Sequence, residues 1–190
     1  MKKYILGSSS PRRQQLLKEL NIDFEIIKPD FDEDILGKIF SYKLIENIAK
    51  NKALSIKEKI DFNAIIISAD TVVINNNIVL GKPIDFNDAF KMLNNLNNKT
   101  HRVVTSVCII DTKNNNVLTK SETSYVTFNN LTKDEIINYI NDFQPYDKAG
   151  SYGIQELPKN FINKVEGDYN NIVGLPTQLV IEMLHEIENK

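Results

Sequence analysis

The sequence predicts an α/β protein whose central β-sheet is mixed, with some strands parallel, others antiparallel, and helices flanking them. Short apolar runs alternate with amphipathic segments along the 190 residues, which favours a sheet covered by helices. Helical segments separate the early strands, as crossover connections between parallel strands require. Asparagine turns separate later strands, which is typical of antiparallel hairpins.

The first part of the chain supplies the expected crossovers. A strand over 3–7 leads to a helix over 11–20, and a short strand follows around 24–27. A helix over about 42–58 then precedes the apolar run 64–73. That run shows almost no polar alternation, which is typical of a strand buried on both faces.

Two asparagine-rich turns predict hairpins, because asparagine tolerates left-handed backbone conformations. The first turn, Asn75–Asn77, joins the run 64–73 to a strand over 78–80. The second joins two long strands over about 101–111 and 116–128.

Cap signals place the later helices. Asp85 is a candidate cap, and Thr132 with Glu135 matches a capping box. The remaining expected elements are helices 85–97, 132–142 and 176–188, a loop-rich stretch over 145–160 and a strand over 161–165. No long Pro/Gly/Ser linker divides the chain, so we expect a single domain over 1–190.

Composition excludes several classes of protein. Hydrophobic content is 42%, charged content 25% and formal net charge -2, which argues against a generally basic surface for a nucleic-acid polymer. The single cysteine, Cys108, excludes an intramolecular disulfide and a multi-cysteine zinc cluster. It lies in an apolar run and is expected to be a buried structural thiol. We expect a cytoplasmic protein without a membrane partner, because neither a signal peptide nor an apolar run of about 20 residues is present.

The segment Gly7–Arg13 is the most informative stretch. Ser10 reads as a helix N-cap and Pro11 as the first helical residue, so Arg12 and Arg13 fall in the first turn. Cations are unfavourable there unless an anion binds at that end of the helix. The alternatives are two solvated arginines, or a phosphate site built from Arg12, Arg13 and the hydroxyls of Ser8 and Ser10.

Asp70 and Lys52 are polar residues in apolar surroundings. Asp70 lies inside the apolar run 64–73, where an unpaired carboxylate would be costly, although it could instead cap a turn. Lys52 falls in the apolar stripe of helix 42–58, so it either extends its stem to solvent or reaches a buried anion.

Two further residues are phosphate-site or metal-site candidates. Glu33 belongs to the acidic loop 30–34, which is either solvated or supplies an oxygen ligand to a divalent cation beside Asp70. Lys82 follows Gly81 in a tight turn and is either solvated or a second phosphate contact.

The segment 147–155 contains two glycines preceded by a charged pair. Its glycines permit close approach to a ligand, and the amide of Gln155 could read a base edge. The segment would serve equally well as a helix-to-strand connection. His101 and His185 are too scattered for a metal site and are expected to be structural.

Taken together, these stretches resemble the Maf family of nucleoside triphosphate pyrophosphatases. The matching segments cover nearly the whole chain in order: 6–17, 68–73, 81–83, 100–105, 147–155 and 166–176. The form Tyr152-Gly153-Ile154-Gln155 resembles the subgroup acting on dTTP and UTP rather than the 7-methyl-GTP subgroup.

The resemblance implies two lobes with an active-site cleft between them, as in inosine triphosphate pyrophosphatase-like proteins. It implies that Asp70 is the catalytic acid–base residue and that Arg12, Thr71 and Gln155 set substrate choice. A divalent cation, Mg²⁺ or Mn²⁺, is the implied cofactor. The implied partner is a small nucleotide, and family members often work as homodimers.

The candidate residues are chemically suited to this activity. Water must attack a highly anionic phosphorus, so a divalent cation and basic side chains would offset the charge while a carboxylate orients or deprotonates the water. We expect Arg12, Lys52 and Lys82 to contact phosphates rather than to form ion pairs, so that alanine at each changes kinetics with little change in melting temperature. The alternatives are a nucleotide-binding regulator of cell division without significant catalysis, and a phosphatase.

Overall fold

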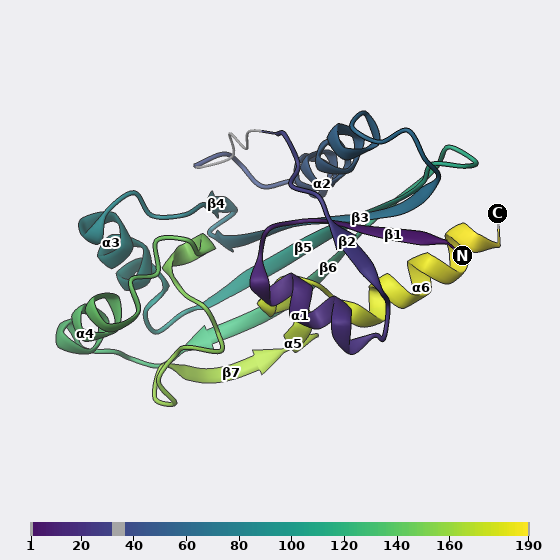
Figure 1. The fold of residues 1–190 in the computed structure, drawn as a ribbon. Coiled ribbons are helices and arrows are strands. Elements are labelled where there is room, and N and C mark those ends of the chain that lie inside the picture. Colours follow the sequence, from purple (N-terminus) through teal and green to yellow (C-terminus); the bar gives the residue numbers. More distant parts are fainter. Residues whose placement is uncertain (1, 32–36, 190) are drawn as a thin grey trace.

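The computed structural model describes residues 2–31 and 37–189 and is built around one long sheet (Figure 1). The strand order is β2-β1-β3-β5-β6-β7, and β4 pairs with β3 off this path. The strands are β1 (Lys3–Gly7), β2 (Phe24–Ile26), β3 (Ala64–Asn75), β4 (Ile78–Leu80), β5 (Thr100–Asp111), β6 (Asn116–Phe128) and β7 (Ile162–Glu166). The helices are α1 (Pro11–Glu19), α2 (Tyr42–Lys57), α3 (Phe86–Leu96), α4 (Lys133–Phe143), the 3-10 helix η1 (Ala149–Ser151), α5 (Tyr169–Val173) and α6 (Thr177–Glu188).

The sheet is mixed, as the sequence predicts. β1 is parallel to both β2 and β3, with helices in the connections. β3 is antiparallel to β4 and β5, and β6 is antiparallel to β5 and β7. The asparagine turns are confirmed, because Asn76, Asn77 and Asn115 have φ of 48°, 64° and 58°. In the two-residue turn between β3 and β4, Asn76 and Asn77 are both left-handed, which matches the right-handed twist of a hairpin.

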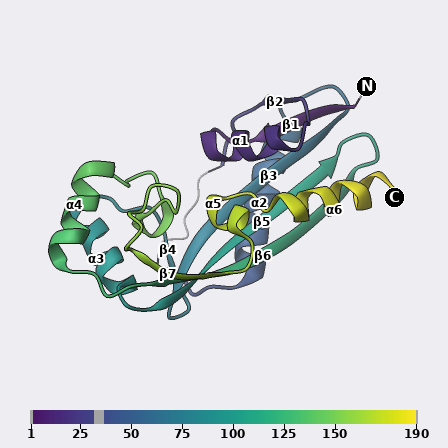
Figure 2. The same cartoon turned by 90° about the horizontal axis from the view of Figure 1, so that it is seen from below.

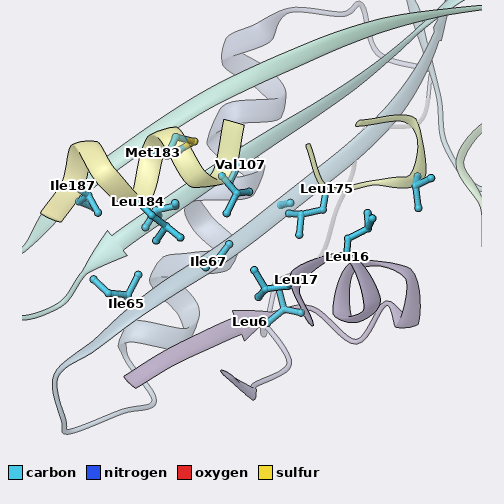
Figure 3. Close-up of a cluster of buried hydrophobic side chains, with 14 residues drawn as sticks. Leu6, Leu16, Leu17, Ile65, Ile67, Val107, Leu175, Met183, Leu184 and Ile187 are labelled. Carbon is cyan, nitrogen blue, oxygen red and sulfur yellow. The ribbon is translucent and has the colours of Figure 1, made fainter. Parts of the chain in front are cut away.

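β3 is buried on both faces, which confirms the interpretation of its unbroken apolar sequence. Ile65 and Ile67 belong to the cluster that α1 and α6 cover, and Ile66 belongs to the cluster under α2. Figure 3 shows Ile65 and Ile67 facing side chains of α1 and α6. Burial of each such side chain is worth roughly 1.5–3 kcal/mol, so this strand anchors the molecule.

A second lobe forms at one end of the long strands. α3 and α4 lie together there, whereas α1 and α6 lie toward the other end (Figures 1 and 2). This lobe has its own core, in which Leu93 of α3 and Tyr139 of α4 pack against Val73, Val103 and Phe128 of the sheet. β3, β5 and β6 contribute side chains to the packing of both lobes and therefore connect them.

The structure differs from the sequence prediction in short elements. η1 lies inside the expected loop 145–160, and α5 forms where no element is predicted. Helices of three and five residues are too short to show hydrophobic periodicity in the sequence. Asp168 caps α5 by accepting a hydrogen bond from the Asn170 N–H. The other predicted boundaries agree with the structure or, like those of β7, differ by one or two residues.

The cap predictions are confirmed at two helices and corrected at one. Asp85 caps α3, and Thr132 and Glu135 form a capping box at α4. Ser10 is the N-cap residue of α1, but its side chain makes no capping hydrogen bond. Among residues 2–31 and 37–189, no helix has the length and apolar character needed to cross a membrane.

Candidate active site

The site lies where β3 is locally an edge of the sheet. β1 pairs with β3 as far as Gly7 opposite Ser68, and β4 joins β3 only from Val73. Among the described strands, residues 69–72 therefore have a partner on the β5 side alone. The loop Ser8–Ser10 leads directly from β1 to α1, so the start of α1 is placed at this opening.

One end of the site is strongly basic. A hollow of about 440 Å³ is lined by the segment from Gly7 to Arg13 and by residues from other elements. Its described basic residues are Arg12, Arg13, Lys28, Lys52 and Lys82. Asp147 is the one acidic residue in that described lining. Such an excess of cations at a helix start suits a group carrying several negative charges.

The start of α1 is built as the sequence predicts, apart from its cap. Pro11 occupies the first helical position, and the first turn contains no acidic residue. The Ser8 hydroxyl accepts a hydrogen bond from the Ser10 N–H at 3.1 Å, so Ser8 shapes the loop before the helix. Ser10, whose side chain does not cap the helix, is among the residues that line the cavity.

Arg13 ties three segments together. Its Nε donates to the Gly174 carbonyl at 2.8 Å, and Nη2 donates to Thr71 Oγ1 at 2.9 Å. Thr71 Oγ1 also lies 2.9 Å from Thr105 Oγ1, so the hydroxyl belongs to a polar network between β3 and β5. Arg13 therefore positions α1 against β3 and the end of α5, and phosphate binding by Arg13 stays a prediction.

Lys52 and Asp70 form the central ion pair. Lys52 Nζ lies 2.6 Å from Asp70 Oδ1, and the two residues are only 7% and 3% exposed. Both also line the cavity. The geometry resolves the two alternatives for Lys52, because the ammonium meets a buried anion instead of extending to solvent. Asp70 lies within β3 and does not cap a turn.

The expectation that the cations form no ion pairs is wrong for two of the three. Lys52 pairs with Asp70, and Arg12 Nη1 lies 3.4 Å from Asp147 Oδ2. Exposed Lys82, by contrast, makes no ion pair with any described residue. The correction has a simple cause, since a cavity that concentrates positive charge also attracts the protein's own carboxylates.

The site is compatible with a divalent cation. Of its two expected protein ligands, Asp70 is among the described residues. Glu33 lies outside the described residues. Within the described ranges, no group of three or more His, Cys, Asp and Glu side chains could hold a metal ion. Mg²⁺ usually binds through one or two carboxylates together with substrate phosphates and water. Asp70, a carboxylate in a cavity suited to phosphates, fits that pattern.

The other end of the site adds apolar side chains to a lining that also carries charged residues. A connected hollow of about 150 Å³ shares Arg12, Lys52 and Lys82 with the basic end. Its further lining comes from β3, β5, α5 and the segment 148–155, and includes apolar Val73, Val103, Ile154, Ile172 and Val173 together with Asp70, Thr71, Lys148 and Gln155. Apolar side chains beside a cationic hollow suit a molecule with a flat, weakly polar ring and a highly charged tail.

Gln155 lies on a turn at this end of the site. The Glu156 N–H donates to the Gly153 carbonyl at 2.9 Å, so Gln155 is the third residue of a four-residue turn. Its side chain is exposed and makes no hydrogen bond with the described residues. The alternative in which Gln155 bonds the backbone of its own loop is therefore not what the structure contains.

Gly150 fixes the path of this segment into the cavity. Its φ is +66°, and an added Cβ would lie 2.9 Å from the Val73 side chain. Its N–H donates to the Gly81 carbonyl at 2.9 Å. The turn that carries Lys82 is thereby joined to the segment that carries Gln155.

His101 is a structural residue behind this segment, as expected. Its Nε2 lies 2.7 Å from the Tyr152 hydroxyl, and its ring packs edge-on against Phe128. Burial lowers the pKa of His101 to about 4. The unfolded chain, with a histidine pKa near 6.5, therefore binds a proton that the folded protein excludes.

Stability should consequently fall as the pH drops from about 6.5 toward about 4. His101 contributes on the order of 3 kcal/mol to this fall. Urea unfolding at several pH values checks it, comparing the wild type with His101→Gln. The variant should lose stability less steeply, whereas His185→Gln, on an exposed histidine, should keep the wild-type slope. An unchanged slope in His101→Gln would assign the pH dependence to other groups.

Three charged residues near the site had no assigned role in the sequence. Lys148 is buried and lies 2.7 Å from Asp147 and 3.1 Å from Glu156. Burial raises the pKa of Asp147, but the Lys148 hydrogen bond and the Lys148 and Arg12 charges outweigh it, so the net shift is downward. In the sequence, the only indication was the charged pair Asp147-Lys148 before the glycines. That pair does not indicate that Lys148 also contacts Glu156.

Comparison with known proteins identifies the family. The family model described as Maf-like protein matches residues 3–187 of the sequence. The chain belongs to the Maf family. A relative from Clostridium beijerinckii, named dTTP/UTP pyrophosphatase, is 44% identical over 98% of this chain and 100% of its own length. A Thermosipho melanesiensis relative with the same name is 47% identical over 95% of each chain.

Solved structures support the fold. The Ham1 protein of Staphylococcus aureus matches 97% of this chain and 99% of its own, with a TM-score of 0.52 and 16% identity. A HAM1 protein from Coxiella burnetii gives a TM-score of 0.52 at 14% identity over 98% of this chain and 100% of its own. This Maf-family chain therefore has the mixed α/β architecture expected from its sequence.

Proposed function

We propose that this Maf-family chain hydrolyses dTTP and UTP to the nucleoside monophosphate and pyrophosphate. The observation that carries the proposal is the make-up of the site, with a cationic end at α1 joined to an end where apolar side chains lie beside Gln155. The names of the Clostridium and Thermosipho relatives support the same substrates. Those names also favour an enzyme over a regulator that only binds nucleotides.

The two residues of the buried ion pair, Asp70 and Lys52, have different roles in the proposed reaction. The Asp70 carboxylate orients a water molecule and takes its proton as the oxygen attacks the α-phosphorus. Lys52 fixes the orientation of Asp70 through the 2.6 Å contact. Arg12 and Lys82 offset the charge of the phosphates and of the departing pyrophosphate. The bond from the α-phosphorus to the bridging oxygen breaks, and one water is consumed.

A divalent cation is part of the proposal. Asp70 would hold it together with the substrate phosphates, and Glu33 is the second ligand implied by the family resemblance. When bound, such a cation supplies electrostatic stabilisation of phosphoryl oxygens.

Product analysis tests the reaction. Purified protein is incubated with dTTP, UTP, CTP and GTP in the presence of Mg²⁺, and the products are separated by chromatography. Monophosphate and pyrophosphate from dTTP and UTP are expected. Release of orthophosphate would indicate a phosphatase, and absence of turnover for every triphosphate would contradict the proposal. Omission of Mg²⁺ with chelator present should abolish turnover.

Base selection should depend on Gln155. Uracil and thymine present carbonyl acceptors beside an N3–H donor, and an amide can pair with such an edge. Gln155→Ala should lower kcat/KM for UTP by about 10- to 100-fold, since a base edge left unpaired costs roughly 1–3 kcal/mol. Steady-state kinetics on UTP, dTTP, CTP and GTP measure this effect.

The matched control is Gln178→Ala, on the exposed surface of α6, where the glutamine contacts Glu182. It should leave every rate unchanged. An equal loss for all four nucleotides in Gln155→Ala would show that Gln155 does not read the base.

Location and assembly complete the proposal. A cytoplasmic location gives access to nucleoside triphosphates, and the family resemblance supports a homodimer. Sedimentation of the purified chain measures its oligomeric state.

A further inference from the structure

Lys148 is a buried lysine that the proposed reaction does not use. It is 7% exposed, and lysine is rarely so buried unless it is paired. Its Nζ has two carboxylate partners, Asp147 Oδ1 at 2.7 Å and Glu156 Oε2 at 3.1 Å. Because this ammonium already contacts two carboxylates, Glu156 and the Asp147 that it shares with Arg12, it has less charge to offer a phosphate than an unpaired lysine would.

The contact of Lys148 with Glu156 joins the two ends of the segment that carries Gln155. Glu156 is the last residue of the turn that begins at Gly153 and presents Gln155. Asp147 is eight positions before Gln155, ahead of η1. Lys148 therefore closes a loop around the base-reading turn, and its ammonium is the link.

The lysine stem restrains the other end of the same turn. A Cβ added to Gly153 would lie 2.9 Å from Lys148 Cε and 3.1 Å from Cδ, so the stem packs directly against the glycine backbone. The Gly153 N–H donates to the hydroxyl of buried Tyr139 at 3.3 Å. Lys148 thus contacts both the first and the last residue of the turn, with Gln155 between them.

We propose that Lys148 is a positioning residue for base selection, which holds the turn Gly153–Glu156 so that Gln155 meets the pyrimidine edge. The inference rests on the proposed function and deepens it. Lys148 acts through Gln155 and touches no reacting atom. A change in its contacts displaces the amide, and displacements of about 1 Å can cost two orders of magnitude in rate.

Four proteins test the proposal: wild type, Lys148→Met, Gln155→Ala and the double variant. Methionine keeps an unbranched stem beside Gly153 but has no charge for Glu156. We expect Lys148→Met to lower the ratio of kcat/KM for UTP to that for CTP by about 10-fold, with unchanged inhibition by pyrophosphate. In the Gln155→Ala background the same change should leave the ratio unaltered, because the group through which Lys148 acts is gone.

Two variants serve as controls. Glu156→Gln removes the charge at the other end of the contact and should lower the UTP-to-CTP ratio of kcat/KM in the same way. This variant tests the contact even if Lys148→Met does not fold. Lys164→Met carries the same substitution on an exposed lysine of β7 that pairs with Glu166, and it should behave as the wild type.

The opposite results are distinct. Equal losses of kcat/KM for UTP and CTP, with weaker pyrophosphate inhibition, would show that Lys148 is a phosphate ligand. An undiminished change of the UTP-to-CTP ratio in the double variant would show that Lys148 acts independently of Gln155. Either result overturns the proposal. If the wild type hydrolyses no nucleotide, the proposed function fails. Calorimetric Kd values for UTP and CTP on the same four proteins then decide the role of Lys148.

Discussion

Asp70→Asn should lower turnover of UTP and dTTP by at least about 100-fold while nucleotide binding is retained. Asparagine has nearly the same shape as aspartate, but it cannot accept the proton of the attacking water. The cationic hollow around Arg12 and Lys82 remains, so affinity for the triphosphate should persist. Single-turnover product analysis gives the rate, and calorimetry gives the Kd.

Asp111→Asn is the matched control. Asp111 is also a buried aspartate, but it lies at the end of β5 and accepts hydrogen bonds from the Lys113 N–H and the Asn114 amide. Its replacement should leave turnover near that of the wild type. A rate for Asp70→Asn within about tenfold of wild type would remove Asp70 from the acid–base role. A cellular phenotype that survives in Asp70→Asn would show that binding, rather than hydrolysis, carries the biological role.

The sequence predicts the larger elements because their burial follows a simple period. β3 is buried on both faces and reads as an unbroken apolar run, and α2 shows its inward stripe at helical spacing. Lys52 stands out as a charged residue within that stripe. Its two alternatives could be separated only by knowing which side chain of β3 faces α2.

The contacts across the site are harder to predict from sequence. Arg12 meets Asp147 and Arg13 meets Gly174, and each pair is more than a hundred residues apart in the chain. Local patterns identify a charged residue at an unusual position, but they do not name its partner. Family resemblance supplied the roles of Thr71 and Gln155, whereas the surroundings of Lys148 became visible only in the structure.

The ion pair also changes what is expected of Lys52. The sequence suggested that alanine here would alter kinetics with little change in melting temperature. Burial of the pair reverses that expectation, because removal of one partner leaves the other charge without its closest counterion. Breaking a buried pair costs about 3–5 kcal/mol.

Lys52→Ala should therefore lower the free energy of unfolding by about 3–5 kcal/mol, or the melting temperature by roughly 6–20 °C for a chain of this size. Calorimetry and urea unfolding measure both quantities. The double variant Lys52→Met with Asp70→Leu should recover much of the loss, since apolar residues of similar volume often replace a buried pair at little cost. Lys50→Met, on an exposed lysine of the same helix, should change stability by less than about 0.5 kcal/mol. A Lys52→Ala protein as stable as the wild type, with only its KM raised, would instead assign Lys52 to phosphate binding, because a stabilising partner of Asp70 cannot be removed without a thermodynamic effect.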